Sequence, residues 1–202
     1  MASFSIHALP NPALDHDTLL EYSSRLRALR LNSLKSDPSS FISRYESEIT
    51  QPEEFWIKRL TNPRAIHVVL VRNNPDHQNT DEKTKLLESQ WVGFLVIAAP
   101  DYQRADNQDN APPEYLMAAL WVDPDVRGHG LGKRLVQTTI DTVKKDATRE
   151  NGASPFCVTS VRQGNDKALK LYQSIGFRII DPNEKIEKEG RTYIATAMRI
   201  DV

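Results

Sequence analysis

The sequence predicts an α+β protein in which helices flank a mixed, mostly antiparallel central sheet. The first observation is the order of segments, namely helices, three strands, a helix, a strand, a helix and two strands. The second is size, because 202 residues with 39% hydrophobic content suit one domain with a substantial core. Neither a repeat nor a second domain is visible, so residues 1–202 are interpreted as a single domain.

Composition narrows the classes of partner. The formal net charge of −1 gives no overall attraction to nucleic acid or to an anionic membrane. A single cysteine, Cys157, rules out an internal disulfide framework, and the histidines lack the spacing of a metal site. Apolar runs fall short of the ~20 residues of a membrane span, and the N-terminus does not resemble a secretory signal. We therefore expect a soluble cytoplasmic protein without a metal, with a nuclear location also open.

Helices are expected in the N-terminal part of the chain. Asp15 or Asp17 can cap a helix whose apolar residues recur at helical spacing. These apolar residues are Leu19, Tyr22, Leu26 and Leu29. Residues 36–40 break this helix, and residues 41–45 suggest another turn or two. Thr50 and Glu53 resemble a capping box that opens a helix over residues 55–60.

Three nearly continuous apolar runs predict strands over residues 66–71, 91–98 and 115–122. Two long polar stretches lie between these strands, near residues 73–88 and 101–113. Both stretches are too long for ordinary hairpin connections. We therefore interpret them as mobile insertions at the strand ends.

The C-terminal part alternates helices and strands. An amphipathic helix is expected from residue 131 to Asn151-Gly152, followed by a strand over 155–161. Asn165 can cap a second helix, and Gly176 is the expected residue at its C-terminal end. The last two strands are expected at 177–180 and 191–200. The connection at 181–189 contains four acidic residues and two lysines. We interpret it as a solvated loop, or as a segment that attracts a cationic amine.

A glycine-rich loop between the third strand and the next helix is the most informative segment. Gly128, Gly130 and Gly132 leave main-chain N–H groups uncovered where the helix begins. The helix dipole at this point, together with Arg127 and Lys133 nearby, favours an anion. The loop therefore predicts a site for the pyrophosphate of a ligand.

Two common phosphate-binding motifs do not fit this loop. A Walker loop would need a glycine in place of Arg127 and a hydroxyl residue in place of Arg134. A dinucleotide-binding fingerprint would need a third glycine in place of Lys133. It would also need a parallel sheet that begins at the preceding strand, whereas helices and other strands come first here.

The pattern that remains is Arg-x-x-Gly-x-Gly, at Arg127, Gly130 and Gly132. It resembles the acyl-CoA-binding motif of the GCN5-related N-acetyltransferase (GNAT) superfamily. A second segment, residues 165–177, is similar to the superfamily's Asn-x-x-Ala-x-x-Leu-Tyr-x-x-x-Gly-Phe motif. A helix and a strand separate the two motifs, as they do in the superfamily, so the pair is a far more specific match than either motif alone.

The resemblance implies that the 115–122 and 155–161 strands splay apart and form an acyl-CoA cleft. The pantetheine arm of acetyl-CoA would lie along Leu120 and Val122, with the pyrophosphate on the amides that follow. Asn165 would hold the arm near the thioester, and Tyr172 would donate a hydrogen bond or a proton to the leaving sulfur. The cofactor-binding residues expected are Leu120, Trp121, Val122, Arg127, Gly128, His129, Gly130, Leu131, Gly132, Lys133 and Asn165.

Several of these residues also have an ordinary structural explanation. Helical spacing alone would let Tyr172 pack with its hydroxyl toward water, and the surrounding motif is what favours the catalytic role. His129 could contact a phosphate or face solvent. For Trp121 packing is favoured over contact with the acceptor, and Cys157 is expected to be inert core.

The expected reaction is transfer of an acetyl group to a primary amine on a small molecule or peptide, by direct attack in a ternary complex. The acceptor would enter beside residues 33–45 and the C-terminal strand pair. We assign no general base, because Glu114 lies roughly 20 Å from Leu120 along the strand. A CoA-binding regulatory module without turnover is one alternative, which Tyr172 and Asn165 argue against, and an unrelated nucleotide-binding domain is another.

Overall fold

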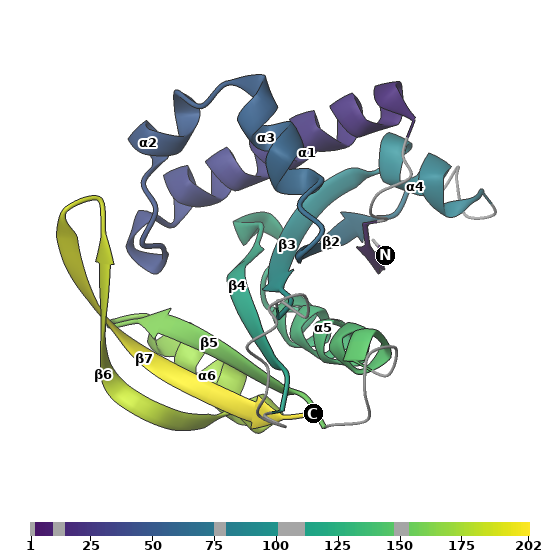
Figure 1. Cartoon of the computed structure of the whole chain (residues 1–202). Helices are drawn as coiled ribbons and strands as arrows, with labels where there is room; N and C mark the ends of the chain where they lie inside the picture. The colour runs from purple at the N-terminus through teal and green to yellow at the C-terminus, as the bar shows by residue number, and fades with distance from the viewer. Residues whose placement is uncertain (1–2, 10–14, 75–79, 101–111, 148–153) are drawn as a thin grey trace.

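Figure 1 shows the computed structural model of the chain, which describes residues 3–9, 15–74, 80–100, 112–147 and 154–202. Its helices are α1 (His16–Ser36), α2 (Tyr45–Ile49), α3 (Glu53–Leu60), α4 (Glu82–Glu88), α5 (Leu131–Ala147) and α6 (Asp166–Ile175). Its strands are β1 (Phe4–Ala8), β2 (Ala65–Arg72), β3 (Gln90–Ala98), β4 (Glu114–Val122), β5 (Phe156–Arg162), β6 (Arg178–Lys188) and β7 (Arg191–Asp201).

The strands form one seven-stranded sheet in the order β1-β2-β3-β4-β5-β7-β6. Neighbouring strands are antiparallel except for β4 and β5, which run parallel. The mixed, mostly antiparallel sheet expected from the sequence is therefore confirmed.

The parallel pair β4 and β5 is joined at one end only. Residues 114–116 of β4 pair with residues 156–158 of β5, whereas β5 pairs with β7 along its whole length. Beyond residue 116 the two strands diverge, as Figure 1 shows. A bulge in β4 accompanies the divergence, because Ala119 has a positive φ of 60° and the register with β3 shifts there. The expected splay of these two strands is thus present.

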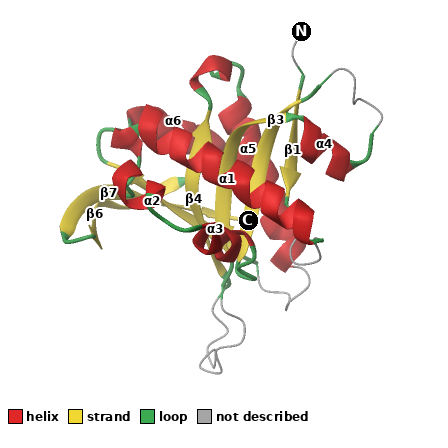
Figure 2. Ribbon diagram, turned by 90° about the horizontal axis from the view of Figure 1, so that it is seen from above, coloured by secondary structure: helices red, strands yellow, loops and turns green. Residues whose placement is uncertain are grey.

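Helices cover both faces of the sheet. α1 crosses the strands on one face with α3 beside it, while α5 and α6 lie on the other (Figure 2). In β2, Val69 and Val71 pack into the cluster that contains α1, whereas Val68 and Leu70 pack into the cluster that contains α5. This burial on both faces explains why the apolar runs of the central strands do not alternate with polar residues.

The expected start of α1 is confirmed, but that of α3 is not. The Asp15 side chain caps α1 by accepting a hydrogen bond from the Thr18 amide. The capping box predicted for the third helix is absent, because α3 begins at Glu53 after Pro52, which makes no side-chain cap. The Thr50 hydroxyl instead donates to the Ser47 carbonyl at the end of α2. The reason is that α2 ends immediately before α3, and Thr50 is its C-cap.

Three further elements differ from the sequence-based expectation. β1 was not predicted and pairs with β2 at the edge of the sheet. Part of the presumed insertion at 73–88 is the helix α4, capped by the Asp81 side chain. The presumed charged loop at 181–189 is mostly strand, since β6 extends to Lys188 and pairs with β7. Residues 75–79, most of the 101–113 insertion and the Asn151-Gly152 helix end lie outside the described residues.

Among the described helices, none is both long enough and apolar enough to cross a membrane.

Candidate active site

Two adjoining cavities open where β4 and β5 diverge. The first, of about 410 Å³, runs along the end of β4 and the glycine-rich loop. The second, of about 360 Å³, lies between β4, β5, residues 40–43 and the β6–β7 hairpin. Five residues line both cavities: Ser40, Phe41, Leu120, Asn165 and Ala168. We call the first the loop cavity and the second the inner cavity.

The glycine-rich loop exposes a run of main-chain donors to the loop cavity. Gly128 and Gly130 have φ values of 86° and 71°, a conformation that other residues adopt only with strain. Among the described residues, the amides of residues 128–133 donate to no backbone or side-chain acceptor, and the first helical bond here runs from the Arg134 amide to the Gly130 carbonyl. Uncovered amides at the N-terminus of α5 suit an anion such as a pyrophosphate.

Side chains at the rim of the loop cavity reinforce its positive potential. Lys133, from the first turn of α5, and Lys167, from the first turn of α6, both line it. Leu131 and Gly132 line it as well, with Leu131 buried in the core. A Cβ at Gly132 would lie 3.4 Å from a methyl carbon of Leu171, so this glycine also permits the close approach of α5 and α6. Lys167 was not among the residues predicted from the sequence.

Arg127 lines the loop cavity, and its guanidinium is hydrogen-bonded to other groups of the chain. Its guanidinium donates to both carboxylate oxygens of Asp37, at 2.6 and 3.1 Å, and to the Val122 carbonyl at 2.8 Å. Trp121, whose side chain is buried, donates its Nε1–H to the same carboxylate at 2.8 Å. The Arg127 side chain thus ties the glycine loop to the end of α1, and one of the two groups expected to bind pantetheine, the Val122 carbonyl, already has a partner.

Asp37 holds this junction together electrostatically. The hydrogen bonds from Arg127, with that from Trp121, lower the pKa of Asp37 to about 2, although partial burial opposes this shift. The carboxylate is therefore ionised at neutral pH and joins the helical layer to β4 and the loop. Asp37 lies 90 residues from Arg127, and sequence analysis gave no signal for this pair.

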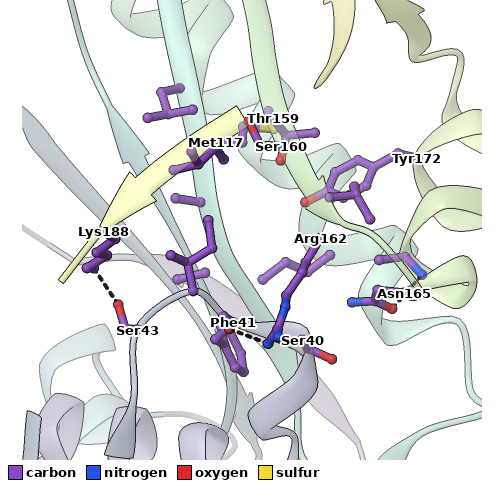
Figure 3. A pocket seen from close by; sticks show the side chains of 18 of the residues that line it. Ser40, Phe41, Ser43, Met117, Thr159, Ser160, Arg162, Asn165, Tyr172 and Lys188 are labelled. Atoms are coloured by element: carbon purple, nitrogen blue, oxygen red, sulfur yellow. Dashed lines mark hydrogen bonds between the residues drawn. The ribbon is translucent and has the colours of Figure 1, made fainter. Parts of the chain in front are cut away.

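Tyr172 points its hydroxyl into the inner cavity (Figure 3). The side chain is 3% exposed and packs edge-on against Phe177, with ring centroids 5.0 Å apart. Burial raises its pKa to about 12, although a hydrogen bond with Thr159 opposes this rise. The phenol is therefore a neutral hydrogen-bond donor over the whole working range of pH. Tyr172 follows Ala168, which lines both cavities, by one helical turn.

Asn165 has the structural role that its position predicts. Its Oδ1 accepts a hydrogen bond from the Ala168 amide and caps α6, while Gly176 ends the helix in the left-handed conformation. The amide Nδ2 takes no part in this cap. Since Asn165 lines both cavities, Nδ2 can serve as a donor at their junction.

The structure brings together most, but not all, of the residues proposed for the cofactor. The residues from that set that line the loop cavity are Leu120, Trp121, Val122, Arg127, Gly128, Gly130, Leu131, Gly132, Lys133 and Asn165. His129 does not line it, and its Nδ1 lies 3.0 Å from the Arg127 carbonyl. Cys157 is buried in β5, which raises the pKa of its thiol to about 12, in line with the expected core role.

The walls of the inner cavity carry no carboxylate or histidine within the described part of the chain. Glu114 lies at the closed end of the strand pair, opposite Phe156, and does not line it. The charged lining residues are instead Arg30, Arg59, Arg162 and Lys188, none of which the sequence singled out. The described residues also contain no cluster of three metal-ligating side chains.

Comparison with known proteins identifies the same architecture. Residues 81–179 match the family model of the acetyltransferase (GNAT) domain. Over 77 residues the chain is 32% identical to the peptidyl-lysine N-acetyltransferase YjaB of Salmonella typhimurium. This match covers 38% of the chain and 45% of YjaB, so the chain aligns with less than half of that relative.

Solved structures extend the likeness to the whole fold. Arabidopsis thaliana NAA60 in complex with acetyl-CoA has a TM-score of 0.60 at 14% identity, over 99% of both chains. Spermidine N-acetyltransferase from Vibrio cholerae, in complex with CoA and spermine, has a TM-score of 0.60 at 16% identity, over 98% of this chain and 95% of the other. Together with the splayed strands and the glycine loop, the family match identifies residues 81–179 as a GNAT acetyltransferase domain.

Proposed function

We propose that the chain is an acetyl-CoA-dependent N-acetyltransferase that acts on a primary amine. One observation carries this proposal. The unpaired stretch of β4 leads through residues 123–127 to the uncovered amides at the start of α5, and Tyr172 lines the inner cavity one helical turn after Ala168, which lines both cavities. The amides would bind the diphosphate of such a cofactor, the β4 edge its amide-bearing arm, and Tyr172 the sulfur of its thioester. YjaB and the spermidine enzyme both take an amine as acceptor, which supports the same class of reaction here.

The cofactor would occupy the loop cavity. Its pyrophosphate would accept hydrogen bonds from the amides of residues 128–133, with Lys133 and Lys167 close by. Its pantetheine arm would lie against the unpaired edge of β4 and take the place of a neighbouring strand. In this assignment Arg127 positions the loop through Asp37, and the backbone of the loop rather than the guanidinium binds the phosphates.

The acceptor would occupy the inner cavity and react without a covalent enzyme intermediate. The amine lone pair attacks the thioester carbonyl carbon, the C–S bond breaks, and CoA leaves as a thiolate. Full proton transfer from a phenol of pKa about 12 to a thiolate whose thiol has a pKa of about 8.5 would cost roughly 5 kcal/mol. Tyr172 would therefore stabilise the departing sulfur by donating a hydrogen bond, and the proton lost from nitrogen would pass to water or to the thiolate.

The cofactor assignment is tested by two matched glycine variants. Gly130 and Gly190 have nearly equal positive φ values, 71° and 70°, and a Cβ at either position would meet nothing within 4 Å. Aspartate therefore imposes the same backbone strain at both, but only Gly130→Asp places a carboxylate beside the proposed diphosphate. We expect at least a tenfold weaker Kd for acetyl-CoA in Gly130→Asp, measured by calorimetry, and no change in Gly190→Asp. Equal affinities would refute the assignment.

Turnover is tested separately, by following free thiol with acetyl-CoA and a panel of primary amines. The panel should include a lysine peptide, a peptide with a free N-terminus and a polyamine. Acceptor-dependent release of CoA supports the transferase. If acetyl-CoA binds but no amine accelerates its cleavage, the chain is instead a CoA-binding module.

A further inference from the structure

The inner cavity is positively charged. The four charged residues that line it are all cationic and come from four separate elements. They are Arg30 from α1, Arg59 from α3, Arg162 from β5 and Lys188 from β6. Within the described part of the chain no acidic side chain lines it. Because these residues are distant in sequence, the concentration of like charge arises from the fold. Such a wall attracts anions and repels a second positive charge on a substrate.

One carboxylate partly neutralises this wall from behind. Glu48 accepts hydrogen bonds from Arg30 at 2.8 Å and from Arg59 at 3.0 Å, and does not itself line the cavity. Burial disfavours the Glu48 carboxylate, but the two guanidiniums outweigh this and lower its pKa. Glu48 is therefore ionised at neutral pH. A single negative charge is shared by two positive ones, which leaves this group with an excess positive charge.

Arg30 lines the inner cavity and has one buried donor without a partner among the described residues. Its Nε and Nη2 donate to Glu48, and its guanidinium lies 4.9 Å from the centre of the Phe41 ring. The residue is only 4% exposed, yet Nη1 is buried without a hydrogen-bond partner among the described residues. A buried guanidinium N–H without an acceptor is costly, and a substrate oxygen could satisfy it.

Arg162 and Lys188 are held by uncharged groups, so their charges remain available. Arg162 donates to the Phe41 carbonyl at 3.0 Å and lies 5.3 Å from the centre of the Tyr193 ring. Lys188 donates to the Ser43 hydroxyl at 2.7 Å, and Figure 3 shows both residues on the cavity wall. The acidic residues at 181, 184, 187 and 189 do not line the cavity. Attraction of a cationic amine by this segment, one of its two interpretations from the sequence, would therefore take place outside this cavity.

We propose that the acceptor carries a carboxylate close to its reactive primary amine, as an amino acid or an acidic peptide N-terminus does. The carboxylate would lie among Arg30, Arg162 and Lys188, and the amine would face Tyr172 and the thioester. A cavity of about 360 Å³ suits a group of this size. This inference rests on the proposed acetyltransferase function, since it names the acceptor of that reaction.

Among the described residues, these walls carry no carboxylate or histidine that could act as a base, and their positive charge affects how the amine loses its proton. A positive wall disfavours the ammonium form of a bound amine and lowers its pKa. An acceptor carboxylate would be bound by the wall, while the amine loses its proton more easily than in water. The lining thus supplies part of what a general base would otherwise provide.

The test compares acceptors that differ in one charge. Asp-Ala and Asn-Ala dipeptides, each with a free or amidated C-terminus, share the same kind of primary amine, and free aspartate and spermidine complete the panel. With saturating acetyl-CoA, we expect kcat/KM at least tenfold higher for Asp-Ala amide than for Asn-Ala amide, and least for spermidine. The preference should shrink as salt is raised. Free aspartate against Asp-Ala distinguishes an amino acid from a peptide as the source of the carboxylate.

A matched pair of variants locates the effect. Lys188→Glu reverses a charge on the cavity wall, whereas Lys185→Glu makes the same change at an exposed position on the same strand that does not line it. We expect Lys188→Glu to lower kcat/KM for Asp-Ala at least tenfold and to raise it for spermidine, while Lys185→Glu matches the wild type. Equal rates for charged and amidated acceptors, or equal effects of the two variants, would overturn the inference.

Failure of the proposed function would be recognised separately. If no acceptor releases CoA, the transferase proposal fails. Calorimetric titration of Asp-Ala into the CoA-saturated protein then still decides the anion site. Binding that Lys188→Glu abolishes and Lys185→Glu retains supports the site, and absence of binding to the wild type refutes it.

Discussion

Replacing Asp37 with asparagine should loosen the junction between α1, β4 and the glycine loop. The side chain of Asp37 accepts two hydrogen bonds from Arg127 and one from Trp121. Asparagine keeps the shape and one acceptor oxygen but removes the charge. The buried Trp121 N–H and the Arg127 guanidinium then compete for a single neutral oxygen.

The magnitude follows from the pKa of Asp37. A pKa lowered from 3.8 to about 2 corresponds to about 2 kcal/mol of stabilisation of the folded state at neutral pH. The carboxylate is 22% exposed, so solvent screening does not erase this value. For a chain of this length, the loss of that amount lowers Tm by roughly 4–8 °C.

The sign of the pH dependence gives a second readout. Because the folded-state pKa is below the unfolded value, the stabilisation is fully present above pH 3.8 and is lost as the pH falls toward about 2. Urea unfolding of wild type and Asp37→Asn should therefore differ by about 2 kcal/mol at pH 7 and 5, and by progressively less at pH 4 and 3. Asp125→Asn, which removes an exposed charge from the connection between β4 and α5, is the control.

Two results would refute this reasoning. The first is a difference between wild type and Asp37→Asn that stays constant from pH 7 to pH 3. The second is an equal loss of stability in Asp37→Asn and Asp125→Asn.

Three further outcomes are expected. Tyr172→Phe should lower kcat roughly tenfold to a hundredfold and leave the Kd for acetyl-CoA unchanged. The control is Tyr115→Phe, which loses a hydrogen bond to Asp146 and should not affect kcat. Equal kcat values for the two variants would rule out the role of the Tyr172 phenol. The pKa of Tyr172 is about 12, so its phenol keeps its proton throughout the assay range. In stopped-time assays of free thiol, kcat/KM should therefore rise with pH to a plateau and show no fall until the pH exceeds about 10. Cys157 should resist a thiol reagent at pH 8 until denaturant is added, and rapid labelling of the native protein would contradict its burial.

The glycine loop and α6 could be predicted because local residue types determine them. A left-handed backbone at Gly128, Gly130 and Gly176 strongly favours glycine, and the Asn165 cap acts within one helical turn. Two such local signals, at fixed spacing around a strand, were enough to indicate the family and the position of the loop cavity.

Other elements gave no comparable local signal. β1 is a five-residue edge strand, and the alternation of apolar and polar residues over so short a run is a weak signal. Most of β6 is exposed beside β7 alone, so its charged sequence looks like a loop. Helix α4 is short and buries one leucine, Leu86, which a periodicity search cannot distinguish from a polar insertion.

The chemistry of the acceptor side depends on contacts between distant segments. Arg30 meets Glu48 across 18 residues, Arg127 meets Asp37 across 90, and Arg162 reaches Phe41 across 121. Neither spacing nor residue type indicates such pairs in a single sequence. The acidic count of residues 181–189 likewise did not reveal that Lys188 lines the inner cavity while the four acidic residues do not.

The sheet consists of two parts, β1 to β4 and β5 to β7, which are joined by the short paired segment of β4 and β5. Three registered residue pairs join the strands there, and α5 also contacts α6. A ligand bound along the unpaired part of β4 and β5 would contact both parts of the sheet and restrict their movement relative to each other. Loading with acetyl-CoA should therefore slow amide hydrogen exchange in β5 and α6, well beyond the atoms that the ligand touches.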